Sequence, residues 1–223
     1  RPRLPGLRAQ SIQVVHTCHA LAGLGFQVTL LADRSHEDSA ASPLELLGLT
    51  PHPQLDLKIC PTAHPPSAGV WFRAQLTRWW MGAPGVVLAR DKRRLISATR
   101  LLPRRHRIVL ETHELDSGLA IEKGENPQQW LATEIQSLAV ADALVANCQG
   151  TLSEWRQVHE AQMPALTAAV HNATAPDRST THHPPKAPLL RYLGSLRTMK
   201  GLLALLEQAG PLSIPLEIIG ATP

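Results

Sequence analysis

Ile108-Val109-Leu110-Glu111 and Ala143-Leu144-Val145-Ala146 are two short apolar runs, and a segment with helical spacing, from about residue 127 to 141, separates them. Short apolar runs that alternate with helices are typical of parallel strands buried on both faces and joined by right-handed crossovers. We therefore predict a strand, a helix and a second, parallel strand over this part of the chain.

The same alternation continues on both sides of this segment. Strands are expected over residues 26–31, 55–60, 86–89 and 168–170, and helices over about 12–24, 70–81, from 91 and through 155. Ser42-Pro43-Leu44-Glu45 has the pattern of a helix capping box. We predict an α/β domain with one doubly wound parallel sheet over residues 26–171. Residues 1–7 are not strand-like, so we expect its opening strand to be missing.

Composition excludes several classes of protein. Of the 223 residues 43% are hydrophobic and 18% are charged, which excludes a disordered tail, a collagen and a coiled coil. No segment reaches the roughly 18 unbroken apolar residues of a membrane helix, and residues 1–5 lack the apolar core of a secretory signal. Three widely spaced cysteines argue against a disulfide framework and a zinc ribbon, so we expect buried thiols and a reducing, cytoplasmic setting.

A change in composition suggests a second domain. Residues 172–188 contain four prolines and almost no apolar side chain, which is typical of a linker. After it the strand and helix rhythm restarts over residues 189–193, 202–208 and 216–219. We predict a first domain over residues 1–175, a linker over 176–186, and an incomplete second domain over 187–223, in a chain that is short at both ends.

Two features suggest contact with anionic partners. A basic run from Arg90 to Arg107 contains eight Lys or Arg residues and one acid, which attracts phosphate in some form but also suits a solvated helix face. The helix over residues 70–81 carries four large aromatic residues and two arginines. This composition is typical of a helix at a membrane surface, although large aromatics also pack in cores. They are Trp71, Phe72, Arg73, Arg78, Trp79 and Trp80.

Tyr192-Leu193-Gly194-Ser195-Leu196-Arg197-Thr198-Met199-Lys200-Gly201 resembles the strand, glycine loop and helix start that open the sugar-nucleotide half of retaining glycosyltransferases with the GT-B fold. Segments upstream are similar, in the same order, to strands and helices of that family's acceptor half. These segments are Arg8-Ala9-Gln10, residues 25–31, Ala89-Arg90-Asp91, Glu111-Thr112-His113, residues 141–147 and Val170-His171-Asn172-Ala173. The resemblance implies two Rossmann-like domains and the transfer of a hexose from an NDP-sugar to an acceptor with retention of configuration.

The resemblance also implies roles for individual residues. Gly194 and Lys200 would hold the diphosphate of the donor, because a glycine loop that opens a helix presents backbone N–H groups to phosphate. Arg197 stands two residues after the family's usual arginine position, and Ser195 occupies that position. His113 would face the donor sugar as the catalytic residue, and an imidazole suits that role at neutral pH. The acceptor-side candidates are Arg8, Arg90 and Asn172.

The resemblance implies no cofactor and no essential metal. The family's paired glutamates would follow residue 223, so the chain alone is expected to be inactive. Glu111 and Glu114 are not proposed as glycosidase carboxylates, because residues an odd number of strand positions apart point to opposite faces. His16 and His19 supply at most two metal ligands, and zinc needs three or four. His182 and His183 are expected in the solvent-exposed linker.

Expected partners are a glycan, lipid-linked or small-molecule acceptor and an anionic membrane surface at the inner face of the membrane. The alternative is a non-catalytic basic module that binds nucleic acid or phosphate. Against it, the chain has one Tyr and two Phe and shows no recognition motif, so no nucleic acid is expected. A dinucleotide-binding enzyme is disfavoured because no Gly-x-Gly-x-x-Gly follows an expected strand.

Overall fold

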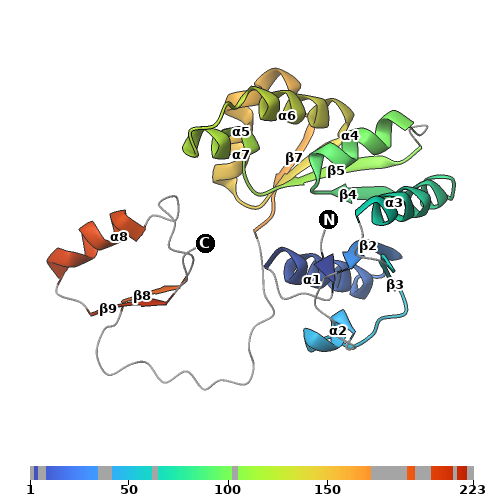
Figure 1. Cartoon of the computed structure of the whole chain (residues 1–223), viewed down its shortest axis with the longest axis horizontal. Coiled ribbons are helices and arrows are strands. Elements are labelled where there is room, and N and C mark those ends of the chain that lie inside the picture. Colours follow the sequence, from blue (N-terminus) through green and yellow to red (C-terminus); the bar gives the residue numbers. More distant parts are fainter. Residues whose placement is uncertain are drawn as a thin grey trace. The chain divides into compact units, whose positions relative to one another are not determined.

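The computed structural model describes residues 3–4, 9–34, 42–61, 65–101, 105–171, 190–193, 202–212 and 215–219. The chain divides into two compact units, Arg1–Asn172 and Ala173–Pro223 (Figure 1). In both units the described strands pair in parallel and helices connect them, as expected for an α/β protein. Within the described residues, no helix is both long enough and apolar enough to cross a bilayer.

The first sheet of the larger unit has three strands in the order β1-β2-β3, over Arg3–Leu4, Val28–Arg34 and Leu55–Ile59. The expectation of a missing opening strand is wrong, because β1 pairs in parallel with β2. This strand was missed because it has two residues and lies between Pro2 and Pro5, which have no amide to donate to a sheet. Helix α1 covers Ala9–Gly23, and α2, over Pro43–Leu46, has the predicted capping box.

The second sheet of this unit has four parallel strands in the order β4-β5-β6-β7, over Val86–Ala89, Arg107–Thr112, Ala143–Ala146 and Leu166–Ala169. The helices are α3 (Pro65–Trp80), α4 (Lys92–Leu101), α5 (Asp116–Glu122), α6 (Gln128–Val140) and α7 (Gln149–His159). The prediction of one continuous sheet over residues 26–171 is therefore wrong, because its described strands form two hydrogen-bonded sheets. Helix α5 was not predicted.

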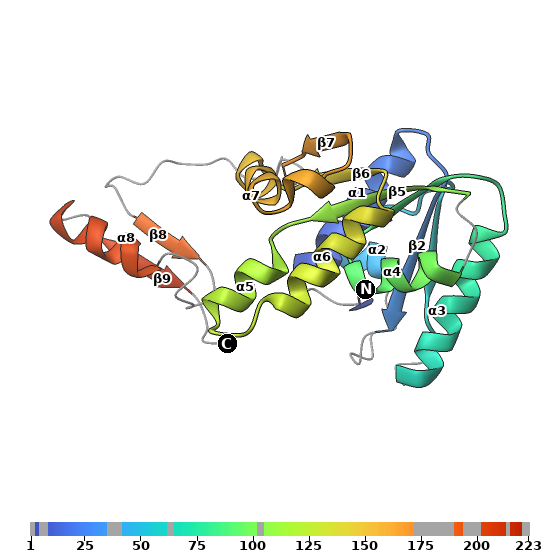
Figure 2. The ribbon, with the colours of Figure 1, turned by 90° about the horizontal axis from the view of Figure 1, so that it is seen from above.

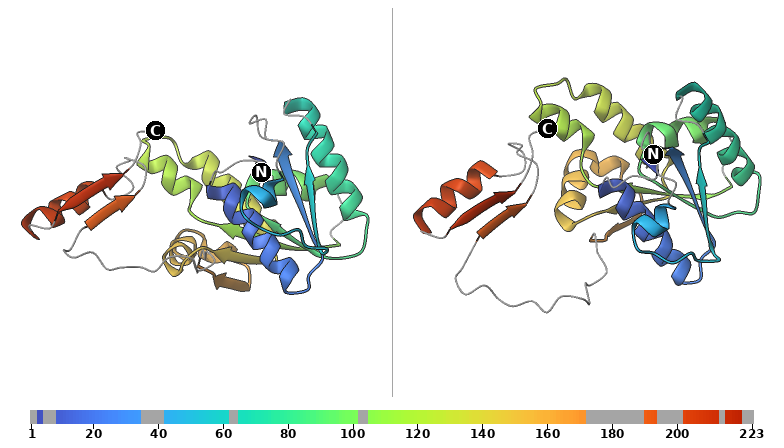
Figure 3. Two further views of the ribbon diagram at one scale, coloured as in Figure 1. Left: turned by 90° about the horizontal axis from the view of Figure 1, so that it is seen from below. Right: turned by 60° about the horizontal axis from the view of Figure 1, so that its bottom comes forward.

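Helices lie on both sides of the four-stranded sheet. Figures 1 and 2 show α5 and α6 on one side of β5, and Figure 3, seen from below, shows α1 on the other. The main core lies between the sheet and the helices of the first side, where Ile108, Leu110, Leu144 and Trp155 are fully buried. This alternation of buried residues along β5 follows from its period of two and leaves Val109 and Glu111 on the opposite face.

The described residues of the smaller unit form a strand, a helix and a second strand. Strands β8 (Leu190–Leu193) and β9 (Leu216–Ile219) pair in parallel, and α8 (Leu202–Ala209) connects them, followed by a 3-10 turn over Gly210–Leu212. These are the elements that the apolar runs of the sequence predict. The expected linker over residues 176–186 lies outside the described residues.

Candidate functional site

The carboxyl ends of β4 and β5 bring three charged or titratable side chains together. Arg90 directly follows β4, Glu111 is the fifth residue of β5, and His113 directly follows it. The register pairs Ala89 with Leu110, so the next residues, Arg90 and Glu111, are cross-strand neighbours. Parallel pairing therefore places a cation beside an anion at the edge of the sheet where ligands bind in open α/β folds.

Arg90 and Glu111 form a two-pronged ion pair. The Nε of Arg90 donates to Oε2 of Glu111 at 2.7 Å, and its Nη2 donates to Oε1. Each side chain keeps 14% of its surface exposed, so the pair is largely withdrawn from solvent. Planar guanidinium and carboxylate groups in this arrangement restrict each other's orientation as well as neutralising charge.

His113 is the most exposed member of this cluster, at 30%. It lies two residues after Glu111, and the contact between the two side chains shows that they lie on the same side of the chain. Its Nε2 is 3.3 Å from Oε1 of Glu111. When Nε2 carries the proton it donates to the carboxylate, which leaves Nδ1 as an acceptor for a ligand hydroxyl.

Helix α1 contributes the other side of the cluster. Nη1 of Arg90 donates to Oε1 of Gln13 at 3.4 Å, a contact between residues 77 positions apart. Cys18, on the same helix, is half-buried. Burial raises the pKa of its thiol to about 11. Arg90 opposes this rise in pKa and Glu111 adds to it, so Cys18 is a neutral neighbour of the ion pair at physiological pH.

The next strand end, after β6, lies beside His113. The backbone N–H of Asn147 donates to the carbonyl of Thr112 at 3.1 Å, and the Thr151 hydroxyl donates to the carbonyl of His113 at 3.4 Å. Cys148 is the N-cap of α7, where its sulfur accepts from the Thr151 N–H at 3.4 Å. Hydrogen bonds from the hydroxyl and the N–H of Thr151 lower the pKa of the Cys148 thiol.

The expectation that all three cysteines are buried is therefore wrong. All three are unpaired, but Cys18 and Cys148 are half-buried, and Cys60 alone is fully buried. Sulfur at an N-cap replaces the usual serine or aspartate, and this use has no strong sequence signal.

The structure brings together two of the site residues expected from the sequence, Arg90 and His113. The others, Arg8, Asn172, Gly194, Arg197 and Lys200, lie outside the described residues. Glu111, which was set aside as a glycosidase carboxylate and given no role of its own, contacts both Arg90 and His113. The sequence feature that could have identified Glu111 is its position two residues before His113. Glu114 is exposed, and its backbone carbonyl accepts from the Thr112 hydroxyl at 2.9 Å.

A second polar cluster is structural. The buried Glu134 accepts from the N–H and the hydroxyl of Ser117, at 3.0 and 2.7 Å, and its Oε2 is 3.0 Å from Nε2 of His159. Serine and histidine both bind the carboxylate, rather than each other as a nucleophile and base would. All three are at most 3% exposed. The carboxylate therefore satisfies an N–H of the first turn of α5 and joins α5, α6 and α7.

His19 of α1 contacts the segment that precedes β3. Nε2 of His19 is 2.9 Å from the Thr50 carbonyl, and its ring meets the His52 ring edge-on at 6.0 Å. In the part of the chain that the structure describes, no three His, Cys, Asp or Glu side chains converge as metal ligands would.

Two arginines of α4, Arg93 and Arg94, lie over aromatic rings. The guanidinium of Arg93 is 4.4 Å from the centroid of the Trp130 ring, and that of Arg94 is 5.9 Å from the centroid of Phe72 on α3. Both arginines remain exposed. Trp79, which was expected either in the core or at a membrane, packs against the core and stacks on His106 with centroids 4.1 Å apart.

Comparison with known proteins adds no assignment. No family model matches the chain. No curated protein matches it either.

Proposed function

We propose that this protein is a retaining glycosyltransferase of the GT-B type, which transfers a hexose from an NDP-sugar to an acceptor. The observation that supports the proposal best is the meeting of Arg90, Glu111 and His113 at the carboxyl ends of two neighbouring parallel strands. That edge is where ligands bind in open α/β folds. The GT-B resemblance puts the donor sugar against His113 and the acceptor near Arg90.

In the proposed reaction, the bond between the anomeric carbon and the diphosphate oxygen breaks, and a bond to an acceptor hydroxyl oxygen forms. The acceptor proton leaves with the diphosphate. Lys200, with Arg197, would stabilise the charge that develops on the departing diphosphate, so the proposal requires no metal. His113 would hydrogen-bond the sugar close to the reacting carbon.

Glu111 would act as a positioning residue in this scheme. Its carboxylate binds Arg90 through Oε1 and Oε2 and approaches Nε2 of His113 through Oε1. A histidine held on one nitrogen presents the other in a fixed direction, which reduces the entropy cost of binding a sugar hydroxyl. Loss of Glu111 should therefore affect turnover through the orientation of His113.

The partner surface of the proposal is the exposed side of α3 and α4. Val70 on α3 and Met81, directly after α3, are 69% and 62% exposed, and Arg73 on α3 and Arg93 and Arg94 on α4 are also exposed. Apolar side chains among arginines suit the interface of an anionic membrane. We include peripheral membrane contact in the proposal for this reason, with a lipid-linked acceptor as one possible substrate class.

Nucleic-acid binding by α4 has less support. A single-stranded nucleic acid would stack its bases on exposed aromatic rings. Arg93 and Arg94 lie over one face of Trp130 and Phe72, so those faces are already covered by the protein's own cations.

The test measures NDP and NDP-hexose binding by calorimetry, and NDP release in the presence of acceptors, with the full-length protein. Lys200→Ala should weaken binding of NDP and NDP-hexose about tenfold to a hundredfold, from the loss of roughly 1.5–3 kcal/mol. Lys123→Ala, at the exposed end of α5, is the matched control and should bind as the parent does. His113→Ala should lower turnover much more than NDP affinity.

Two results would contradict the proposal. One is that no NDP-hexose binds to the parent protein. The other is that Lys200→Ala and His113→Ala bind and turn over NDP-hexoses as the parent does.

A further inference from the structure

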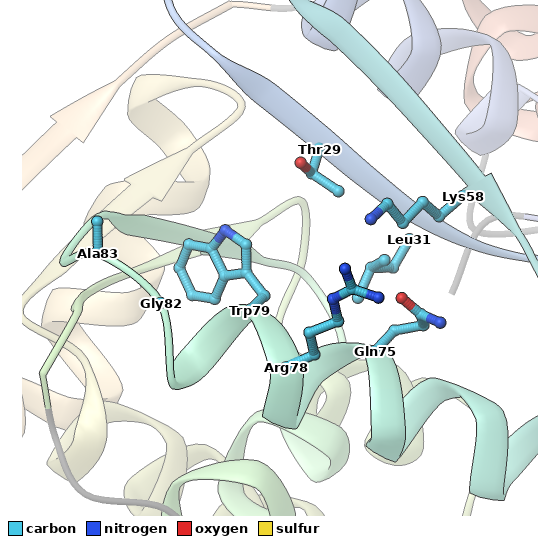
Figure 4. Close-up of a pocket in the computed structure, with 8 residues that line it drawn as sticks. All are labelled: Thr29, Leu31, Lys58, Gln75, Arg78, Trp79, Gly82 and Ala83. Carbon is cyan, nitrogen blue, oxygen red and sulfur yellow. The ribbon is translucent and has the colours of Figure 1, made fainter.

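A cavity of about 300 Å³ lies between α3 and the strands β2 and β3 (Figure 4). Gly82 and Ala83 at its rim precede β4, whereas Arg90 follows that strand. The cavity and the Arg90–Glu111–His113 cluster therefore lie at opposite ends of β4. None of the cluster residues lines it. Its polar and aromatic lining is formed by Thr29, Lys58, Gln75, Arg78 and Trp79.

Two cations from different elements meet at this cavity. Lys58 comes from β3 and Arg78 from α3, and Figure 4 shows their side chains extending toward each other. Lys58 has an exposed ion-pair partner, Asp56, at 3.3 Å. Within the described residues Arg78 forms no such pair. Two cations in a partly enclosed space repel each other. An anion bound between them attracts both, so that the net electrostatic energy of the site becomes favourable.

Neutral hydrogen-bonding groups surround the two cations. Thr29 and Gln75 both line the cavity, and a hydroxyl and a side-chain amide are groups that can donate to an oxyanion. A guanidinium offers several donors in a fixed plane, and an ammonium offers three that can turn. This combination suits a tetrahedral group with several oxygen atoms and up to two negative charges, which is a phosphate ester.

The aromatic wall of the cavity is held in place from behind. The Trp79 indole stacks on the imidazole of His106, and the two rings are tilted by 30° to each other. Nδ1 of the buried His106 accepts from the Gly85 N–H at 3.0 Å. A Cβ on Gly85 would lie 3.3 Å from Cζ2 of Trp79, so the backbone also approaches the indole closely. A wall fixed in this way is formed before any ligand arrives, which lowers the cost of binding.

We propose that this cavity binds the phosphate group of a small phosphorylated molecule, at a site separate from the one that would carry out hexosyl transfer. Arg78 and Lys58 neutralise the phosphate, Thr29 and Gln75 donate to its oxygens, and the organic part lies against Trp79. A cavity of this volume, at the small end of ligand sites, suits a body of about one sugar ring. The phosphate can belong to a soluble ester or to a lipid headgroup.

Calorimetry of the full chain with a hexose 6-phosphate tests the proposal, with the unphosphorylated hexose as the ligand control. Arg78→Gln and Lys58→Gln should each weaken binding of the ester about tenfold or more, because each removes a charged hydrogen bond. Arg156→Gln is the matched control: it removes one exposed arginine, on α7, that does not line the cavity. It should bind the ester as the parent does. Far-UV circular dichroism checks that each variant is folded.

A second arm identifies the source of the phosphate. Vesicles that contain phosphatidic acid are added, and binding is measured with and without the soluble ester. Saturable binding of the ester without vesicle binding supports a soluble phosphate. Vesicle binding that the ester competes away, and that is lost in Arg78→Gln but kept in Arg156→Gln, supports a lipid phosphate at the same site. The proposal is overturned if the parent binds neither probe saturably. It is also overturned if the Arg156→Gln and Arg78→Gln variants lose affinity equally, since the attraction would then be one of net charge.

Discussion

A double-mutant cycle, in which Glu111 and Arg90 are removed separately and together, measures the coupling free energy of the ion pair in the candidate site. The pair has two hydrogen bonds between charged groups, and such bonds contribute about 1.5–3 kcal/mol each when solvent is excluded. Fully exposed ion pairs contribute only about 0.2–1 kcal/mol. With 14% of each side chain exposed, the pair lies between these limits and nearer the first. We expect a coupling free energy of about 2 kcal/mol.

The measurement is urea unfolding of the parent, Arg90→Ala, Glu111→Ala and the double variant. Tryptophan fluorescence reports the larger unit, because all five tryptophans lie between residues 71 and 155. Arg90→Lys keeps the charge but loses the planar fork, and we expect it to recover about half of the coupling. The same cycle on Lys58 and Asp56, which are 36% and 57% exposed, is the control and should give at most about 0.5 kcal/mol.

The salt dependence of the coupling free energy also distinguishes the two ion pairs. Raising the ionic strength should reduce the coupling of Lys58 to Asp56 more than that of Arg90 to Glu111, because exposed charges are screened more. A coupling of Arg90 to Glu111 below about 0.5 kcal/mol, or one as sensitive to salt as the control, would refute the reasoning. The strand register would then not produce a tight ion pair at this edge.

Three further outcomes are expected. Glu134→Ala should lower the free energy of unfolding by about 3–5 kcal/mol in the same urea assay, because it leaves three buried donors of Ser117 and His159 without an acceptor; exposed Glu154→Ala should change it by less than about 0.5 kcal/mol, and equal losses would contradict this role. Iodoacetamide followed by peptide mass mapping should label Cys148 before Cys18, because a lowered pKa gives Cys148 more thiolate at a given pH, whereas Cys18 has a pKa of about 11; preferential labelling of Cys18 at pH 8 would be the opposite result. In vesicle sedimentation, the Arg93→Gln, Arg94→Gln double variant should bind anionic vesicles less than the parent at low salt, and high salt should release the parent, since charges are screened over about 10 Å at 0.1 M. Binding that is unchanged by both salt and substitution would remove the membrane surface from the proposal.

Local patterns in the sequence were enough to predict most of the individual elements. The apolar runs around Ile108 and Leu144 are buried strands, and residues 216–219 form β9 as expected. The capping box of α2 was also predictable, because Ser42 and Glu45 act within four residues: the Ser42 N–H donates to the Glu45 carboxylate at 2.9 Å. Such features depend on periodicity and on contacts between near neighbours, which the order of residues specifies directly.

The candidate site could be predicted only in part. The positions of Arg90 and His113 after apolar runs indicated that they lie at strand ends. That Glu111 joins them depends on the register of β4 against β5, and a shift of one residue would turn its side chain to the other face. Helix α1 supplies Gln13 from 77 positions away, and no local pattern marks that contact.

The sequence by itself determined the alternation of strands and helices, the parallel pairing that follows from it, and the strand ends that carry polar residues. The tertiary structure alone decided that the described strands of the larger unit form two sheets, that Glu134 binds α5 to α7, and that Lys58 meets Arg78. Burial periodicity is set by each residue's immediate neighbours along the chain. Charge pairing and cavities depend on which distant segments pack together, and many packings are compatible with the same apolar pattern.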